Sequence, residues 1–183
     1  KNTFFYPTFL NVYKDSDSIK INPDITLFKK SYSIEFISKD YDSISKRQSF
    51  IARLNKKNKI DYLPTKFIDS VFKTKSIHAG TYFLAKDSTP PTIKPINFIK
   101  NQWLSNSKFL KIKIEDDLSG IKSYKGEING KWVLFEYEPK KKNLTYDFND
   151  IKFKSGKQDL NIKVTDNVGN ESVFKTSFYR KYD

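Results

Sequence analysis

The sequence predicts an all-β protein made of two tandem immunoglobulin-like β-sandwich domains, residues 1–87 and 88–183. Apolar and polar residues alternate with a period of two along most of the chain, which is typical of half-buried strands. Short strand patterns follow one another at the spacing of turn residues, as in β-sandwiches. A Pro-Pro pair at 90 and 91 divides the chain into two halves of roughly 90 residues, each long enough to bury a modest core.

The first half contains short strand patterns that are bounded by Asp, Asn, Pro and Lys. These patterns cover residues 9–13, 18–22, 31–37, 49–55, 59–64, 70–75 and 80–86. Only residues 39–48 favour a helical turn, with Asp42 or Ser43 as the cap. The joint between the domains is expected at 87–91, because two prolines fix φ, remove two N–H donors and make a short, stiff connection.

The second half alternates more regularly. Polar residues alternate there with apolar side chains that are expected to be buried. These apolar residues are Leu110, Ile112 and Ile114, then Leu160, Ile162 and Val164, and then Phe174 and Phe178. Asn129-Gly130 is a hairpin signal, and the aromatic run 130–139 after it is predicted to be one strand with Trp132 in the core. About seven strands are expected between 93 and 179.

Composition bounds the class of protein. The chain has no cysteine, so its stability must come from a core to which 16 Phe, 11 Tyr and 2 Trp contribute. No apolar run approaches the roughly 20 residues of a membrane-spanning helix, so no transmembrane segment is predicted. The chain has no Met and begins at Lys1, from which we expect a piece of a longer polypeptide.

The net charge of +13 raises the question of a nucleic-acid partner. Residues 1–87 hold 16 basic and 9 acidic side chains (+7), and residues 88–183 hold 18 and 12 (+6), so the charge is spread evenly. Only three basic residues are Arg, the side chain that base and phosphate recognition favours. We therefore predict no nucleic-acid partner and keep an anionic envelope polymer, such as lipopolysaccharide, as an alternative.

No catalytic residue and no cofactor site is predicted. The one histidine, His78, excludes the common zinc hydrolase motifs, which need two or three imidazoles. His78 also has no G-x-S-x-G partner, and SIHAGTYFLA around it reads as a turn that enters a strand. A structural or surface role for His78 is the simpler interpretation.

Three carboxylates at strand ends have two interpretations. Asp116, Asp117 and Asp166 could converge at one pole of the second domain and bind calcium, which takes six to eight oxygens. Asp side chains in turns also accept hydrogen bonds from nearby backbone N–H groups, which by itself explains residues 117–120 and 166–170. The turn role is preferred, and no metal is predicted.

Trp103 lies in the polar segment KNQWLSN. Packing beneath a loop is the favoured interpretation, and contact with a partner protein or a sugar ring is the alternative. Trp103 is therefore the one candidate interface residue.

The same segments carry a resemblance to a known family. GTYFLAKDSTPPTI (80–93), QWLSN (102–106), residues 110–148 and LNIKVTDNVGNES (160–172) resemble the C-terminal immunoglobulin-like region of large bacterial envelope proteins. Those proteins carry a lysostaphin/LytM-type zinc peptidoglycan endopeptidase domain. IARLNKKNKIDYL (51–63) resembles the β domain that precedes this region in them. The zinc motif of the family, H-x(n)-D with H-x-H, is absent from these residues, so no catalytic residue is carried over.

The resemblance implies a non-catalytic accessory or docking module in the bacterial cell envelope, periplasmic or associated with the outer membrane. Its implied partners are other envelope proteins or the rest of the same polypeptide, within an outer-membrane assembly. A carbohydrate- or peptidoglycan-binding module is the alternative, and it requires exposed aromatic side chains such as Trp103.

Overall fold

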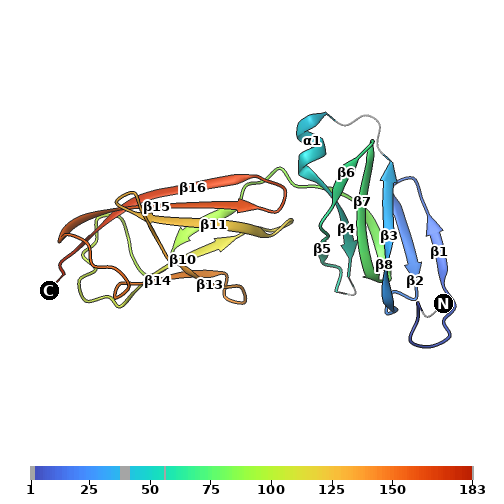
Figure 1. Cartoon of the computed structure of the whole chain (residues 1–183), viewed down its shortest axis with the longest axis horizontal. Helices are drawn as coiled ribbons and strands as arrows, with labels where there is room; N and C mark the ends of the chain where they lie inside the picture. Colours follow the sequence, from blue (N-terminus) through green and yellow to red (C-terminus); the bar gives the residue numbers. More distant parts are fainter. Residues whose placement is uncertain (1–2, 38–41, 56, 183) are drawn as a thin grey trace. The chain divides into compact units, whose positions relative to one another are not determined.

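A computed structural model describes residues 3–37, 42–55 and 57–182 of the chain (Figure 1). Nearly all regular structure is β, which confirms the predicted all-β, sandwich-type fold. The chain divides into two compact units, Lys1–Ser88 and Thr89–Asp183. The described residues contain no helix with the length and apolar character needed to cross a bilayer.

The first unit consists of two antiparallel sheets and one short helix. Its elements are β1 (Asn11–Lys14), β2 (Ser18–Asn22), β3 (Leu27–Ile37), α1 (Ser43–Gln48), β4 (Ser49–Leu54), β5 (Ile60–Tyr62), β6 (Lys66–Ile68), β7 (Val71–His78) and β8 (Gly80–Lys86). One sheet has the order β1-β2-β8-β4-β5 and the other β3-β7-β6. The core between them contains Phe28, Ile34, Ile51, Phe72 and Tyr82.

Local sequence explains most of these elements. β2 and β8 begin and end where the alternation predicted. The backbone N–H of Ser45 donates to Asp42 Oδ1 at 2.7 Å, so Asp42 caps α1 as expected, although the first part of the predicted turn, 39–41, lies outside the described residues. β6 was not predicted, because a three-residue strand carries almost no periodicity.

The N-terminal segment lies along one edge of the first unit. The backbone of Phe4 pairs with Phe28 of β3, and Lys29 N–H donates to the Thr3 carbonyl at 2.8 Å. Further along, β1 pairs with β2 as the outermost strand of the other sheet (Figure 1). The segment therefore contacts both sheets, and all four residues of β1 remain exposed.

The second unit is a sandwich of two four-stranded sheets. Its strands are β9 (Thr92–Pro95), β10 (Phe109–Glu115), β11 (Ile121–Ile128), β12 (Lys131–Val133), β13 (Glu136–Glu138), β14 (Asn143–Asp147), β15 (Gly156–Asp166) and β16 (Glu171–Arg180). The sheets have the orders β13-β14-β10-β9 and β12-β11-β15-β16. Leu110, Ile112, Leu160, Ile162 and Phe178 meet in the core, as the alternation predicted.

The prediction for residues 130–139 was wrong in one respect. This run is two strands, β12 paired with β11 and β13 paired with β14, so the chain changes sheets at Leu134 and Phe135. Phe135 enters the core and Val133 points inward, which leaves Trp132 on the outer face with 57% of its surface exposed. Trp132 is therefore not a core residue, and the unit has one strand more than expected.

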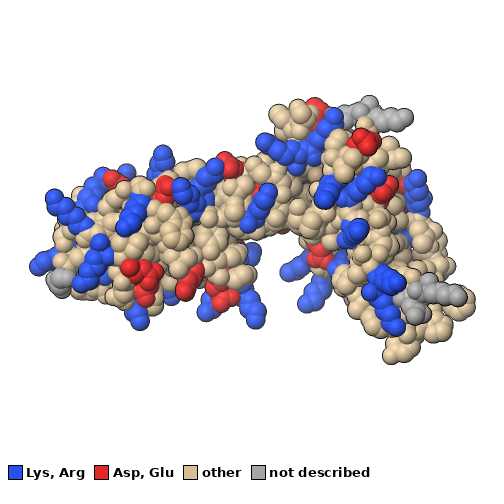
Figure 2. Space-filling view, in the orientation of Figure 1, with Lys and Arg blue, Asp and Glu red and all other residues tan. Residues whose placement is uncertain are grey.

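Charged side chains of both signs are interspersed over both units on the face that Figure 2 shows. In the second unit several lysines pair with a neighbouring carboxylate. Examples are Lys125 with Glu127, Lys157 with Asp159 and Lys163 with Glu171, the last at 2.8 Å. Such exposed pairs contribute little to stability. They do show that part of the basic charge on this sheet lies beside a carboxylate.

Candidate functional site

The most unusual polar group of the first unit is an arginine on the inner face of a sheet. Arg53 of β4 pairs with Asp61 of β5 on one side and with Tyr82 of β8 on the other. Paired residues of an antiparallel sheet point to the same face, and Tyr82 is completely buried in the core. Arg53 and Asp61 therefore occupy core-facing positions, where charged residues are rare unless they are paired.

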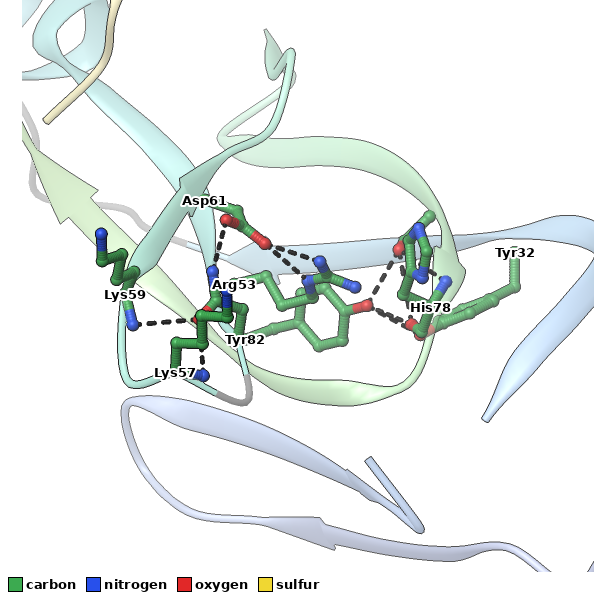
Figure 3. Close-up of polar contacts among 9 residues, drawn as sticks. Tyr32, Arg53, Lys57, Lys59, Asp61, His78 and Tyr82 are labelled. Atoms are coloured by element: carbon green, nitrogen blue, oxygen red, sulfur yellow. Dashed lines mark hydrogen bonds and ion pairs between the residues drawn. The ribbon is translucent and has the colours of Figure 1, made fainter. Parts of the chain in front are cut away.

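The two charges form a close ion pair (Figure 3). Nε and Nη2 of Arg53 donate to Asp61 Oδ2 at 3.2 and 2.6 Å, and Asn55 Nδ2 donates to Asp61 Oδ1 at 2.9 Å. The side chain of Arg53 is 17% exposed and that of Asp61 34%. Partial burial acts to raise the pKa of the Asp61 carboxyl, but the hydrogen bonds from Arg53 and Asn55 outweigh it and hold this pKa below its ordinary value.

Two tyrosine hydroxyls hold the corner at which the chain passes from one sheet to the other. β7 belongs to one sheet and β8 to the other, and they are separated by Ala79 alone. The hydroxyls of Tyr32 and Tyr82 lie within hydrogen-bonding distance of the His78 carbonyl, and Ser76 Oγ lies 2.9 Å from the Tyr82 hydroxyl. Burial, followed by the hydrogen bond with Tyr82, raises the pKa of the Tyr32 hydroxyl, so it stays protonated and can donate.

The imidazole of His78 is exposed at this corner, on the side of Arg53 away from Asp61 (Figure 3). Its pKa is lowered, first by partial desolvation and then by the positive charge of Arg53, while Asp61 acts in the opposite direction. His78 is therefore mainly neutral near pH 7. His78 is the last residue of β7, so a strand end stands where a turn was expected, and Ala79 alone leads into β8.

Arg53, Asn55 and His78 border a hollow of about 400 Å³. Its lining includes Asp24, Ile25, Arg53, Asn55, Lys57 and His78. The hollow thus combines the side chains of an arginine and a lysine with an imidazole, one carboxylate and apolar side chains. This combination suits recognition of a small polar or charged group, and we call it the Arg53 hollow.

Of the three carboxylates predicted at the pole of the second unit, Asp116 and Asp166 are turn-forming residues. Asp116 Oδ1 accepts from the backbone N–H of Leu118 at 3.2 Å and of Gly120 at 2.6 Å. Asp166 Oδ1 accepts from the N–H of Val168 at 3.0 Å and of Asn170 at 2.8 Å. Both turns are therefore built on a carboxylate, as the preferred interpretation required.

The same carboxylates bear on the calcium alternative. Oxygens of Asp116 and Asp166 lie within 4.8 Å of each other, whereas Asp117 is exposed and is not part of this cluster. Backbone N–H donors already occupy one oxygen of each clustered carboxylate. Calcium binding by Asp116 and Asp166 stays the untested alternative to the preferred turn role.

Trp103 does not pack beneath a loop. Its side chain is 62% exposed, and its backbone forms an isolated bridge with Tyr179 at the edge of β16. The rings of Trp103 and Tyr179 lie 5.1 Å apart between centroids. One face of the indole is thus supported, which fits an interface role, and that role stays a prediction.

Sequence reasoning missed Arg53, Asp61, Tyr32 and Tyr82 as a group. The strand SFIARL is apolar on both faces, so its alternation does not reveal that Arg53 points inward. Asp61 lies in a three-residue strand with no pattern of its own. The clearest available signal was the scarcity of arginine, with one of only three lying inside the predicted strand 49–55.

No protein-family model and no curated protein sequence matches the chain. Among solved structures, an endo-β-1,4-mannanase from Thermotoga petrophila is similar over 53% of this chain and 21% of its own, with 7% identity and a TM-score of 0.45. Fibronectin(III)-like modules of Clostridium thermocellum CbhA are similar over 83% of this chain and 86% of theirs, with 14% identity and a TM-score of 0.38.

Dimeric latent PorU from Porphyromonas gingivalis is similar over 90% of this chain and 21% of its own, with 15% identity and a TM-score of 0.43. The chain therefore spans about a fifth of the length of the mannanase and of PorU. We assign no activity and no partner to the chain from these similarities.

Proposed function

We propose that the chain is a non-catalytic accessory module of a larger bacterial cell-envelope protein, and that it docks the parent polypeptide on a protein partner. The sequence resemblance to regions that accompany LytM-type peptidases supports the envelope assignment. The observation that carries the docking role is an exposed apolar stretch in the first unit.

This stretch, residues 5–13, we call the N-terminal apolar segment. Phe5, Tyr6, Phe9, Val12 and Tyr13 are each more than half exposed, and Phe9 is 96% exposed. Monomeric soluble proteins rarely expose large apolar side chains in such density, and larger apolar patches mark sites of interaction. Four of the five are aromatic, the class enriched at the centres of protein–protein interfaces.

The backbone of the segment supports the same role. β1 has one pairing partner, β2, and forms the end of its sheet. An unpaired strand edge can accept a strand from a partner, with backbone hydrogen bonds giving affinity and side chains giving specificity. A protein partner therefore fits both the side chains and the backbone of this edge.

Photo-crosslinking in cells that make the parent protein tests the proposal. A benzoylphenylalanine at Phe9 should yield one dominant adduct, mapped by mass spectrometry to a second envelope protein or to another part of the parent polypeptide. The matched control is the same probe at Ile37, which is 74% exposed on β3 of the other sheet. Equal, diffuse labelling from both positions would remove the docking role.

The alternative, a carbohydrate- or peptidoglycan-binding module, is favoured by one observation. Trp103 and Trp132 are both more than half exposed, and exposed indoles can stack on sugar rings. Co-sedimentation of the chain with purified murein separates the two functions. Binding that is lost in Trp103→Ala or Trp132→Ala supports the alternative, and unchanged pelleting of both variants removes it.

A further inference from the structure

One edge of the Arg53 guanidinium is hydrogen-bonded to Asp61, and we call the other edge its open edge. A guanidinium presents its N–H groups along two edges that each match a carboxylate. The edge formed by Nε and Nη2 faces Asp61 Oδ2. The other edge, formed by Nη1 and Nη2, has no hydrogen-bond partner among the residues that the structure describes.

The open edge is held in a fixed position. Asp61 orients the guanidinium and is itself held by Asn55 Nδ2. The stem of Arg53 lies against the backbone of Gly80, where an added Cβ would stand 3.4 Å from both Cγ and Cδ. Because Gly80 has φ +141°, a side chain there would also strain the backbone. A donor pair fixed in this way loses little conformational entropy when it binds a ligand.

The surroundings of the open edge determine which ligand fits. Lys57 and the neutral His78 add further donors to the Arg53 hollow, and Ile25 gives it an apolar wall. Asp24 in the lining and Asp61 behind Arg53 balance the charges of Arg53 and Lys57. Two nearby carboxylates disfavour a dianion such as phosphate, whereas a planar monoanion matches two parallel N–H groups.

We propose that the Arg53 hollow is a binding site for a carboxylate group, which accepts two hydrogen bonds from the open edge of Arg53 and one from His78. An alkyl group attached to that carboxylate would pack against Ile25. The site goes beyond the docking role and does not depend on the N-terminal apolar segment.

Binding should couple to protonation of His78. Arg53 on β4 and Asp61 on β5 act on its imidazole, and Asp24 before β3 and Lys57 after β4 line the same hollow. The other ionisable groups near His78 are Tyr32 on β3 and Tyr82 on β8, whose hydroxyls contact the His78 carbonyl. Arg53 and partial burial favour the neutral imidazole in the free protein. A bound negative charge favours the protonated form, so the ligand should raise the pKa of His78.

The chain's single histidine makes this effect directly measurable by NMR. The probe is N-acetylalanine, titrated into the 183-residue chain while the imidazole signals of His78 are followed from pH 5 to 8. We expect a saturable shift and a rise in the pKa of His78 of about half a unit, less than the one to three units of a close buried pair.

Two other probes define the ligand class. N-acetylalaninamide, which lacks only the charge, should leave the signals of His78 unchanged. Inorganic phosphate should bind more weakly than N-acetylalanine. Equal effects of the amide and the acid, tighter binding of phosphate, or no response to the acid would each overturn the proposal.

Variants test the assigned donors. Arg53→Lys keeps the positive charge and loses the two-donor edge, so it should bind N-acetylalanine about tenfold more weakly, whereas Arg47→Lys on the exposed face of α1 should bind normally. Asp24→Asn removes an opposing carboxylate and should bind about threefold more tightly, a gain that damage to the fold cannot produce. Unchanged binding in both Arg53→Lys and Asp24→Asn would refute the site.

Discussion

His78 combines a structural backbone with a free side chain. Its carbonyl is the acceptor for the hydroxyls of Tyr32 and Tyr82, and its backbone N–H donates to Ser76 Oγ at 3.1 Å. Its imidazole takes part in none of these bonds. A substitution that changes only the imidazole should therefore leave the corner between β7 and β8 intact.

The separate roles of the backbone and the imidazole of His78 give a prediction about how the free energy of unfolding depends on pH. Because the pKa of His78 is lowered in the folded state, the unfolded chain binds more protons between that pKa and the ordinary value near 6.5. The free energy of unfolding should therefore fall as the pH decreases from 7 through this window. His78→Gln should flatten this slope in urea denaturation measured at pH 5, 6 and 7.

The pH range in which His78 titrates lies above the range of the carboxylates, so an Asp61 variant can serve as a control. The lowered pKa of Asp61 removes stability only as the pH falls through the carboxylate range, below that of His78. Asp61→Asn should therefore destabilise the chain at all three pH values and should widen the slope due to His78, because the charge of Asp61 raises the pKa of that imidazole. An unchanged slope in His78→Gln would show that His78 has its ordinary pKa.

At the level of single residues, sequence predicted roles that depend on local hydrogen bonds. The Asp42 cap and the turns at Asp116 and Asp166 follow from side chains that reach their own backbone. The inward orientation of Arg53 does not, because it depends on which face of β4 meets the second sheet. The candidate site therefore became visible only when Asp61 and His78 were placed beside Arg53.

The β11–β12 hairpin shows how one element is fitted to its core. Asn129 and Gly130 have φ values of 52° and 74°, as the two-residue hairpin signal predicted. Gly126, two residues before β11 ends, lies beneath the ring of Phe135. An added Cβ would stand 2.3 Å from a ring atom, so only glycine fits unless the ring moves.

Gly126→Ala should therefore overpack the second unit and lower its free energy of unfolding by about 1–3 kcal/mol. Ser123→Ala, on the exposed face of the same strand, should change stability little. Chemical denaturation measures both. Adding Phe135→Leu to Gly126→Ala should restore part of the loss, and no restoration would show that the cost lies in the backbone.

The aromatic run 130–139 shows what an apolar sequence pattern can and cannot predict about a strand. Density of apolar residues correctly predicted that Val133 and Phe135 are buried, although Phe135 lies between the two strands. It could not show that the chain changes sheets between them, since that change depends on the pairing of β12 with β11 and of β13 with β14. The exposure of Trp132 follows from the pairing and not from local composition.

On the scale of the whole molecule, the chain has two separate apolar cores. One contains Phe28, Ile51 and Tyr82 of the first unit, and the other contains Leu110, Ile162 and Phe178 of the second. The joint expected at 87–91 coincides with the residues between β8 and β9. The position of this joint could be predicted from the sequence, because proline restricts the backbone in any tertiary context.

Separate cores predict separate folding. Fragments 1–88 and 89–183, expressed individually, should each give a dispersed amide NMR spectrum that overlays on that of the whole chain away from the cut. The matched control is a cut inside the second unit, after Gly130, which divides β11 from β12 and should give unfolded fragments. A collapsed spectrum from either native-boundary fragment would contradict independent folding.

The edge formed by β1 has a practical consequence for handling the purified chain. An open strand edge with exposed Val12 and Tyr13 and one charge, Lys14, has little of the protection that natural edge strands use against joining one another. Concentration during crystallisation or storage should therefore favour edge-to-edge aggregates, and a lysine in place of Val12 is the first solubilising change to make.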